Sequence, residues 1–366
     1  MKIFVPLIAM VILFLSCKKN TDEDKNNTDY VDNNSIIKVS GGTYNSLLLK
    51  QDASVWQMTD YDITNPGYPT GNSSIVIKKV MDNVKEMSAG VGLSFILKND
   101  GTVWAAGIHH EGQFGDGDTI THIGYKQVFS DAKAVSVTMN HCLILKNDGT
   151  AWASGSNKFG QLGTGDTINR NQFVQVSTNV SQISAGLHHS IILKNNGSVW
   201  CTGLNSFGSL GTGDTVLRRN FTLTATNAVS ISAGYYHSLI LKSDATVWAT
   251  GNNSSGELGR GDTTNSYNWV QTASGTKQIC AGWICSYLLK NDNSLYVSGY
   301  NYDRFGIPTV SSTASVWSYT KAEENVLSIS PATYYTLIIK PDNKVYVSGN
   351  SGGVANGNKF KLLPFK

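Results

Sequence analysis

Over most of the chain, short apolar or alternating stretches are separated by turns rich in glycine and asparagine. In one typical stretch, residues 180–186 alternate between apolar and polar side chains, residues 190–194 form an apolar run, and residues 198–203 are rich in β-branched and aromatic side chains. Asn-Asn-Gly at 195–197 signals a tight turn, and residues 220–224 alternate again after a glycine-rich loop. The pattern predicts four short β-strands, with no helical period of useful length.

The same pattern recurs along the chain with a fixed spacing. A lysine returns every 48 residues, with one final spacing of 50, at Lys50, Lys98, Lys146, Lys194, Lys242, Lys290 and Lys340. Six residues after each lysine stands an aromatic residue, namely Trp56, Trp104, Trp152, Trp200, Trp248, Tyr296 and Tyr346. Seven copies of a four-stranded unit predict an all-β fold, a seven-bladed β-propeller. An open solenoid is the alternative, although it would leave strand edges exposed.

The two ends of the repeat array indicate how the ring closes. Residues 36–40 resemble the first strand of the typical copy at 180–184, and residues 359–363 resemble the fourth strand at 172–176. We therefore expect N- and C-terminal strands to close the ring, with the N-terminal strand completing the blade that holds the C-terminus.

One motif links the repeat to a known family. It reads Ser-Ala-Gly-x-x-His-Ser-x-x-Leu-Lys-x-Asp-Gly-x-Val-Trp-x-x-Gly-x-Asn-x-x-Gly-Gln-Leu-Gly-x-Gly-Asp-Thr and is almost complete at 184–215 and 232–263. The stretch 159–167, Phe-Gly-Gln-Leu-Gly-Thr-Gly-Asp-Thr, is especially specific. Residues 35–366 thus resemble the regulator of chromosome condensation (RCC1) repeat, which implies a seven-bladed propeller. The first copy departs from the motif after Trp56, and the last two copies lack the Gly-Gln-Leu-Gly stretch.

The N-terminus has the features of a secretory leader. Residues 1–17 begin Met-Lys, continue with a short apolar run and end in Phe-Leu-Ser-Cys, which looks like a bacterial lipobox with Cys17 as the lipidated residue. Residues 18–34 are polar and charged, which predicts a disordered tether. A plain signal peptide is the alternative. We expect a lipoprotein of the cell envelope, anchored to the outer membrane and facing either the periplasm or the cell surface.

Charge and residue spacing argue against several kinds of function. The chain has 29 basic and 26 acidic residues, without the strong positive bias that nucleic-acid binding usually requires. The histidines that stand five residues before the lysine in three copies are expected to bond a neighbouring blade: His141, His189 and His237. The Gly-Asp-Thr turns are expected to be structural. The sequence therefore predicts no metal site, no cofactor and no catalytic residue. Cys280 and Cys285 are interpreted as small apolar residues, with a disulfide as the alternative.

A variable pair of residues in each copy is the candidate binding site. The pair lies in a turn between the recurring glycine and the second strand, and it is rich in residue types that are enriched where proteins bind partners. Its members predict a shallow concave face: Tyr44, Met139, His188, Tyr235, Tyr236, Trp283 and Tyr334. The alternative is that these side chains partly plug the central channel.

We therefore predict a lipid-anchored binding module that recognises an extracytoplasmic protein or glycan through one face of the propeller. Known relatives of the RCC1 type include a nuclear exchange factor, but that role does not suit a chain with a secretory leader. A propeller inhibitor of β-lactamases is the closer analogy. The alternatives are an enzyme acting on envelope polysaccharide or peptidoglycan, with carboxylates at the channel mouth, and a purely structural or adhesive surface protein.

Overall fold

The computed structural model describes residues 35–43, 45–59, 76–311, 313–351, 354–355 and 359–363, all within one compact unit, Val31–Lys366. The predicted signal peptide, its lipobox residue Cys17 and the tether 18–34 lie outside these residues. No α-helix occurs in the described ranges. Within them, accordingly, no helix has the length and apolarity needed to cross a membrane.

The described strands form seven separate antiparallel sheets, which we call blades 1 to 7 in chain order. Blade 1 contains β1 (Ile36–Gly41), β2 (Asn45–Lys50), β3 (Val55–Thr59) and β4 (Val76–Met81). Blade 2 contains β5 (Val84–Ala89), β6 (Leu93–Lys98), β7 (Val103–Gly107) and β8 (His122–Phe129). Blade 3 contains β9 (Ala132–Val137), β10 (His141–Lys146), β11 (Ala151–Gly155) and β12 (Arg170–Ser177). Blade 4 contains β13 (Val180–Ala185), β14 (His189–Lys194), β15 (Val199–Gly203) and β16 (Arg218–Ala225).

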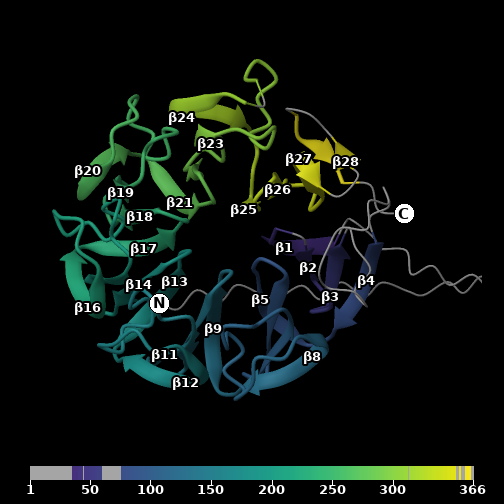
Figure 1. Cartoon of the computed structure of the whole chain (residues 1–366). Helices are drawn as coiled ribbons and strands as arrows, with labels where there is room; N and C mark the ends of the chain where they lie inside the picture. Colours follow the sequence, from purple (N-terminus) through teal and green to yellow (C-terminus); the bar gives the residue numbers. More distant parts are fainter. Residues whose placement is uncertain are drawn as a thin grey trace, which may run out of the picture. The chain divides into compact units, whose positions relative to one another are not determined.

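The last three blades repeat this plan. Blade 5 contains β17 (Ala228–Ala233), β18 (His237–Lys242), β19 (Val247–Gly251) and β20 (Ser266–Ala273). Blade 6 contains β21 (Thr276–Ala281), β22 (Cys285–Lys290), β23 (Leu295–Tyr300) and β24 (Ser315–Glu323). Blade 7 contains β25 (Ser328–Pro331), β26 (Tyr335–Ile339), β27 (Val345–Ser351), β28 (Val354–Ala355) and β29 (Lys361–Leu362). The blades stand in a ring around a central channel (Figure 1), which confirms the predicted seven-bladed propeller.

The second strand of each blade is the apolar run seen in the sequence, and it is buried on both faces. In β14, every residue from His189 to Leu193 is buried and only Lys194 is partly exposed. Both faces are covered because each blade packs between two neighbours, so the strand need not alternate between apolar and polar residues. One apolar cluster, for example, combines Phe95 and Val103 of blade 2 with Cys142 and Ile144 of blade 3.

The recurring glycines serve the contact between one blade and the next. A Cβ on Gly163 would lie 2.6 Å from the ring of Phe221, which comes from the fourth strand of the following blade. Two residues later, the amide of Gly165 donates a 2.8 Å hydrogen bond to the carbonyl oxygen of Arg219 in that same strand. The Gly-Gln-Leu-Gly-Thr-Gly loop therefore lies against its neighbour, and this contact explains why the loop recurs so strictly.

The recurring aromatic residue packs between blades, as the sequence suggested. Trp248 of blade 5 packs against an apolar cluster shared by two blades, which includes Ile191 and Leu210 of blade 4 and Ile240 of blade 5. Its Nε1 donates to Oγ1 of Thr246 at 3.0 Å, and Nζ of Lys242 lies 3.8 Å from the ring centroid. The lysine and tryptophan columns found in the sequence are thus one repeated structural contact.

The ring closes where blades 1 and 7 meet. Strand β1 packs against β25 and β26 across this seam. The Tyr335 hydroxyl and Oγ of Ser46 share a hydrogen bond there, and the amide of Gly41 donates to Oγ of Ser330 at 2.9 Å. The expectation that the N-terminal strand completes the blade of the C-terminus is wrong. Strand β1 pairs with β2 in its own blade, and β29 completes blade 7 by pairing with β27. The strands of each sheet are consecutive in the described sequence, so each blade comes from one continuous copy.

The four described cysteines, Cys142, Cys201, Cys280 and Cys285, are free thiols. Burial raises the pKa of both Cys201 and Cys280 to about 12, so these side chains stay protonated near neutral pH. Their environment matches the interpretation of the cysteines as small apolar residues.

Candidate functional site

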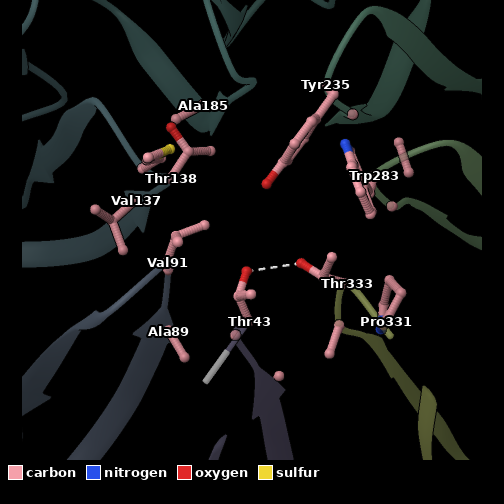
Figure 2. A pocket seen from close by; sticks show the side chains of 18 of the residues that line it. Thr43, Ala89, Val91, Val137, Thr138, Ala185, Tyr235, Trp283, Pro331 and Thr333 are labelled. Atoms are coloured by element: carbon pink, nitrogen blue, oxygen red, sulfur yellow. Dashed lines mark hydrogen bonds between the residues drawn. The ribbon is translucent and has the colours of Figure 1, made fainter. Parts of the chain in front are cut away.

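The turns between the first and second strands of the blades surround the mouth of the central channel. Together with the ends of the first strands they line a cavity of about 160 Å³, and side chains on its wall include Val91, Thr138, Met139, Tyr235, Trp283 and Thr333. Figure 2 shows the side chains of Val91, Thr138, Tyr235, Trp283 and Thr333 converging from different blades. Because each blade contributes one turn, the residues that vary between copies meet around a single opening.

Tyr235 reaches across this opening. Its hydroxyl points into the opening, and burial, which is the largest cause, raises its pKa above the ordinary value of tyrosine. The hydroxyls of Thr43 and Thr333 lie 2.7 Å apart and share a hydrogen bond, drawn in Figure 2. The Tyr235 side chain thus occupies part of the channel mouth.

Further aromatic rings continue outward from Tyr235. The ring centroids of Tyr235 and Trp283 are 5.6 Å apart. Trp283 stacks on Tyr302 at 5.8 Å with an angle of 3° between the ring planes, and it meets Tyr334 edge-on at 5.8 Å. Tyr302 also contacts Tyr300 at 4.4 Å. These spacings are typical of favourable aromatic pairs, so the rings form one continuous surface.

The same surface extends in the other direction along the ring. Tyr236 lies 6.5 Å from Tyr235, 6.2 Å from His188 and 5.2 Å from Phe207, measured between ring centroids. His188 in turn lies 4.9 Å from Phe159. We call the connected rings the aromatic band; its members are Phe159, His188, Phe207, Tyr235, Tyr236, Trp283, Tyr300, Tyr302 and Tyr334. The band runs from blade 3 to blade 7.

The structure brings together most of the predicted binding residues. His188, Tyr235, Tyr236, Trp283 and Tyr334 all belong to the aromatic band. Met139 is 47% exposed and lines the channel mouth beside the band. Tyr44 lies outside the described residues.

Sequence reasoning missed the aromatic residues that come from a second set of loops. Phe159, Phe207 and Tyr302 lie between the third and fourth strands, within stretches that looked like recurring scaffold. Phe207 is 37% exposed, whereas an aromatic side chain that served only to pack the loop against its neighbour would be buried. Tyr302 has a φ of 44°, a left-handed conformation that is uncommon for an aromatic residue. Aromatic residues in polar, glycine-rich loops were the signal that could have revealed them.

The recurring histidines have the structural role predicted for them. Nε2 of His141 lies 2.8 Å from Oγ of Ser190 in the next blade, and Nε2 of His237 lies 3.0 Å from Oγ of Ser286. Burial lowers the pKa of His141 to about 3 and that of His237 to about 4, so both rings are neutral near pH 7. They are fixed hydrogen-bonding groups between blades.

The Gly-Asp-Thr turns are also structural in blades 3 and 4. Oδ1 of Asp166 accepts a hydrogen bond from the amide of Ile168 at 3.0 Å, and its Oδ2 accepts one from Arg170 at 2.6 Å. These bonds lower the pKa of Asp166 to about 2, the backbone bond contributing most. Asp214 makes the corresponding contacts with Val216 and Arg218.

The chemistry of the channel mouth is apolar and aromatic. Among the described residues that line it there is no aspartate, glutamate, asparagine or glutamine. Polar groups are supplied by the hydroxyls of threonine and tyrosine and by the backbone. An arrangement of this kind offers area for apolar contact together with a few fixed hydrogen-bonding groups.

The fold and this surface define a seven-bladed β-propeller with an aromatic face. The chain belongs to the family of RCC1-like domains, whose family model matches residues 14–303. A comparison with curated protein sequences found no match to this chain.

Solved structures of related fold agree with the family. The structure of yeast RCC1 (Prp20) bound to Kap60 superimposes with a TM-score of 0.71 at 19% identity, covering 86% of this chain and 80% of that chain. Human WBSCR16 gives a TM-score of 0.70 at 16% identity, with 88% of each chain covered. At these identities the likeness concerns the fold.

Proposed function

We propose that this chain is a binding module that recognises a protein partner through the aromatic band. The observation that carries the proposal is the unbroken series of ring contacts from Phe159 to Tyr334 on one face of a rigid ring. Aromatic side chains are enriched among the residues that contribute most to protein–protein affinity. Tyr334 is 39% exposed, so a partner would bury ring surface that is now in water.

A protein partner is favoured over a glycan by the residues that line the channel mouth beside the band. Sugar binding combines aromatic stacking with a dense set of side-chain carboxylates and amides that bond the sugar hydroxyls. The described residues lining the channel mouth supply none of these groups. The apolar side chains of Val91, Met139 and Trp283 are better suited to apolar side chains of a protein.

The relatives of known structure also support protein binding. In two related structures, yeast RCC1 (Prp20) is bound to Kap60, and Prp20p from Saccharomyces cerevisiae is described by its binding to Gsp1p and histones. These relatives support only the general use of the fold as a surface that binds proteins. The predicted leader, with Cys17 as its expected lipidated residue, favours a partner outside the cytoplasm and a lipid-anchored protein of the cell envelope.

The test compares two aromatic residues of the band with an exposed aromatic residue elsewhere on the same molecule. Full-length chain is immobilised and used to capture proteins of the envelope and medium, the captured protein is identified, and its affinity is then measured by calorimetry. Trp283→Ala and Tyr334→Ala should each weaken binding about tenfold or more, since central aromatic residues commonly contribute 2 kcal/mol or more. Trp317→Ala is the matched control, because Trp317 is 52% exposed on β24, outside the band.

The control should bind like the wild type. Wild-type affinity in all three variants would contradict a role for the band. If Trp317→Ala weakened binding as much as the two band variants, the partner would instead bind a different surface. Release of soluble fragments from envelope polysaccharide by the wild type would favour the enzymatic alternative.

A further inference from the structure

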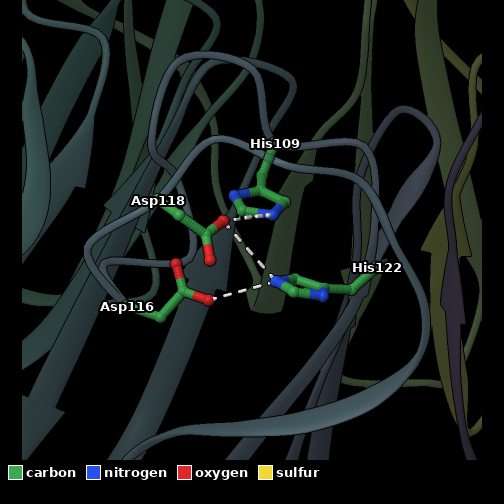
Figure 3. A group of neighbouring side chains, drawn as sticks. All are labelled: His109, Asp116, Asp118 and His122. Atoms are coloured by element: carbon green, nitrogen blue, oxygen red, sulfur yellow. Dashed lines mark ion pairs between the residues drawn. The ribbon is translucent and has the colours of Figure 1, made fainter.

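Blade 2 contains a cluster of two histidines and two aspartates that the repeat motif does not explain. The ligand atoms of His109, Asp116, Asp118 and His122 all lie within 4.8 Å of one another. Nε2 of His122 is 3.3 Å from Oδ2 of Asp116 and 3.6 Å from Oδ1 of Asp118, and Nε2 of His109 is 3.6 Å from the same Oδ1. Figure 3 shows the four side chains converging from the loop after β7 and the start of β8.

The same four positions in the next blade hold a different set of residues. The positions of His109, Asp116, Asp118 and His122 are taken in blade 3, 48 residues later, by Asn157, Thr164, Asp166 and Arg170. In blade 3 the set is fully bonded. Nδ2 of Asn157 donates to Oγ1 of Thr164 at 2.9 Å and to Oδ1 of Asp166 at 2.9 Å, while Arg170 pairs with Oδ2 of Asp166.

Blade 4 repeats the bonding of blade 3 with identical residue types. Its four residues are Asn205, Thr212, Asp214 and Arg218. Nδ2 of Asn205 donates to Oγ1 of Thr212 at 3.0 Å, and Arg218 pairs with Asp214 at 2.6 Å. Because an amide, a hydroxyl and a guanidinium complete this loop in two blades, the fold itself does not require imidazoles or a second carboxylate there. Blade 2 has exchanged three of the four positions together, and all three now carry groups that bind metal ions.

The exchange leaves buried polar atoms of blade 2 without hydrogen bonds. His109 is fully buried and the Asp116 side chain is 4% exposed. Within the described part of the chain, no hydrogen-bond partner is found for Oδ1 of Asp116, Nε2 of His122 or Nδ1 of His109. Buried polar atoms are nearly always bonded, so this concentration in one cluster calls for a ligand. The ring of His109 is held by Phe114, which stacks on it with centroids 3.9 Å apart.

We propose that His109, Asp116, Asp118 and His122 bind a divalent transition-metal ion of the zinc type. In a tetrahedral site with bonds of about 2.0–2.1 Å, the ligand atoms lie about 3.3 Å apart. The three distances of 3.3, 3.6 and 3.6 Å are close to that value. Small side-chain movements, together with release of the hydrogen bond between Nε2 of His109 and the carbonyl oxygen of Ile120, complete the site. Two imidazoles and two carboxylates suit zinc better than calcium, which takes six to eight oxygen ligands.

Charge balance supports the same conclusion. The two carboxylates carry two negative charges, which one divalent ion neutralises. In the structure, Nζ of Lys126 lies 2.8 Å from Oδ2 of Asp116 and 3.6 Å from Oδ2 of Asp118. The Lys126 side chain is 44% exposed, so its ammonium group can move into solvent when a metal ion binds. The ammonium group of Lys126 thus competes with a metal ion for the two carboxylates. In blade 3 the guanidinium of Arg170 neutralises Asp166 in a similar way.

The metal would have a structural effect on blade 2. His109 is the second residue after β7, and His122 is the first residue of β8. An ion bound to both clamps the two ends of the connecting loop, whose residue Asp116 also forms a bridge with Gln172 of blade 3. This inference concerns a loop that contributes no residue to the aromatic band, so it does not depend on the proposed function.

The test is a zinc titration of chelator-treated full-length chain by calorimetry, accompanied by the visible spectrum of the Co²⁺ form. The wild type should bind one Zn²⁺ per chain, and Co²⁺ should give the absorption of a four-coordinate site. The variant H109N/D116T/H122R copies the residues of blade 3, so it should fold with a closely similar melting temperature and lose the site. His122→Gln alone should weaken zinc binding at least tenfold.

Two further variants separate this site from other zinc-binding groups. His110→Asn changes an exposed histidine next to the cluster and should leave zinc binding unchanged. Lys126→Gln removes the competing ammonium and should strengthen zinc binding severalfold, an effect that a purely structural cluster would not show. The proposal is overturned if the wild type binds no zinc, or if the triple variant binds it with the same stoichiometry and affinity.

Discussion

Nε2 of His189 lies 2.9 Å from Oγ of Ser238, so a buried imidazole of blade 4 bonds a buried hydroxyl of blade 5. The hydroxyl of Ser238 donates in turn to the carbonyl oxygen of Ser209 at 2.7 Å. In blade 1 the place of the histidine is taken by Asn45, whose Nδ2 donates to Oγ of Ser94. An asparagine, which does not titrate, can therefore make the same contact between blades as the histidine, and blade 1 already uses it.

This contact predicts that the propeller loses stability between pH 7.5 and pH 5. Burial lowers the pKa of His189 to about 3 in the folded protein, whereas an unfolded histidine titrates near 6.5. The unfolded chain binds more protons between these values, so the stabilisation is complete above pH 6.5 and falls as the pH decreases toward 3. At pH 5 the loss is about 2 kcal/mol for each such histidine.

The variant His189→Asn isolates this effect. It copies Asn45, so it should keep the hydrogen bond to Ser238 while removing one titrating group. Free energies of unfolding measured in urea at both pH values should show that the variant loses about 2 kcal/mol less than the wild type. An identical pH dependence of wild type and variant would exclude His189 as a source of the acid sensitivity.

A second prediction concerns the glycines that face the neighbouring blade. A Cβ on Gly211 would lie 2.4 Å from Nε1 of Trp269, and the φ of Gly211 is 70°. Gly211→Ala should therefore cost about 1 kcal/mol for the backbone conformation and a further 1–3 kcal/mol for the overlap with the indole. Gly275 has a φ of 64° but no heavy atom within 4 Å of a Cβ. Gly275→Ala should show the conformational cost alone, and urea unfolding measures both.

The architecture could be predicted from the sequence because the contacts between blades recur. In blades 2 to 6, for example, a glycine at the position of Gly163 faces an aromatic ring of the next blade, so the same packing requirement produces a visible period in the sequence. The blade to which the first strand belongs could not be predicted in the same way. Pairing of β1 within blade 1 depends on where the copy begins relative to its strands, and the similarity of residues 36–40 to a first strand was compatible with either blade.

The two candidate sites differ in how far the sequence could reveal them. The variable turns could be located because residues such as Tyr236 and Trp283 occupy positions at which the residue type differs from copy to copy of the motif. The cluster of blade 2 was missed because His109 and His122 are 13 residues apart and replace two different scaffold residues. Only alignment of blade 2 with blades 3 and 4, position by position, shows that the exchanges occur around one point in space.

A third prediction separates the two roles of the channel mouth. Tyr235→Phe removes the hydroxyl that lies near Thr333 and Thr43 in the channel mouth but keeps the ring beside Trp283. The free energy of unfolding should fall by about 1 kcal/mol, while partner affinity should change less than twofold. Tyr236→Phe is the matched control and should alter neither quantity, since the contacts described for Tyr236 are made by its ring. A large loss of affinity in Tyr235→Phe would instead place its hydroxyl in the binding surface.

The last prediction tests whether the tryptophan column serves packing alone. Trp248→Ala removes a ring that lies between blades 4 and 5, so it should cost about 3–5 kcal/mol of unfolding free energy in urea. Trp248→Tyr should cost much less, because Tyr296 and Tyr346 occupy the same position in blades 6 and 7 and also lie beneath a lysine. The tyrosine variant should bind the partner with unchanged affinity, since Trp248 contacts the scaffold of blade 4 and lies outside the aromatic band. Lost affinity in a stably folded Trp248→Tyr variant would show that this column also contacts a ligand.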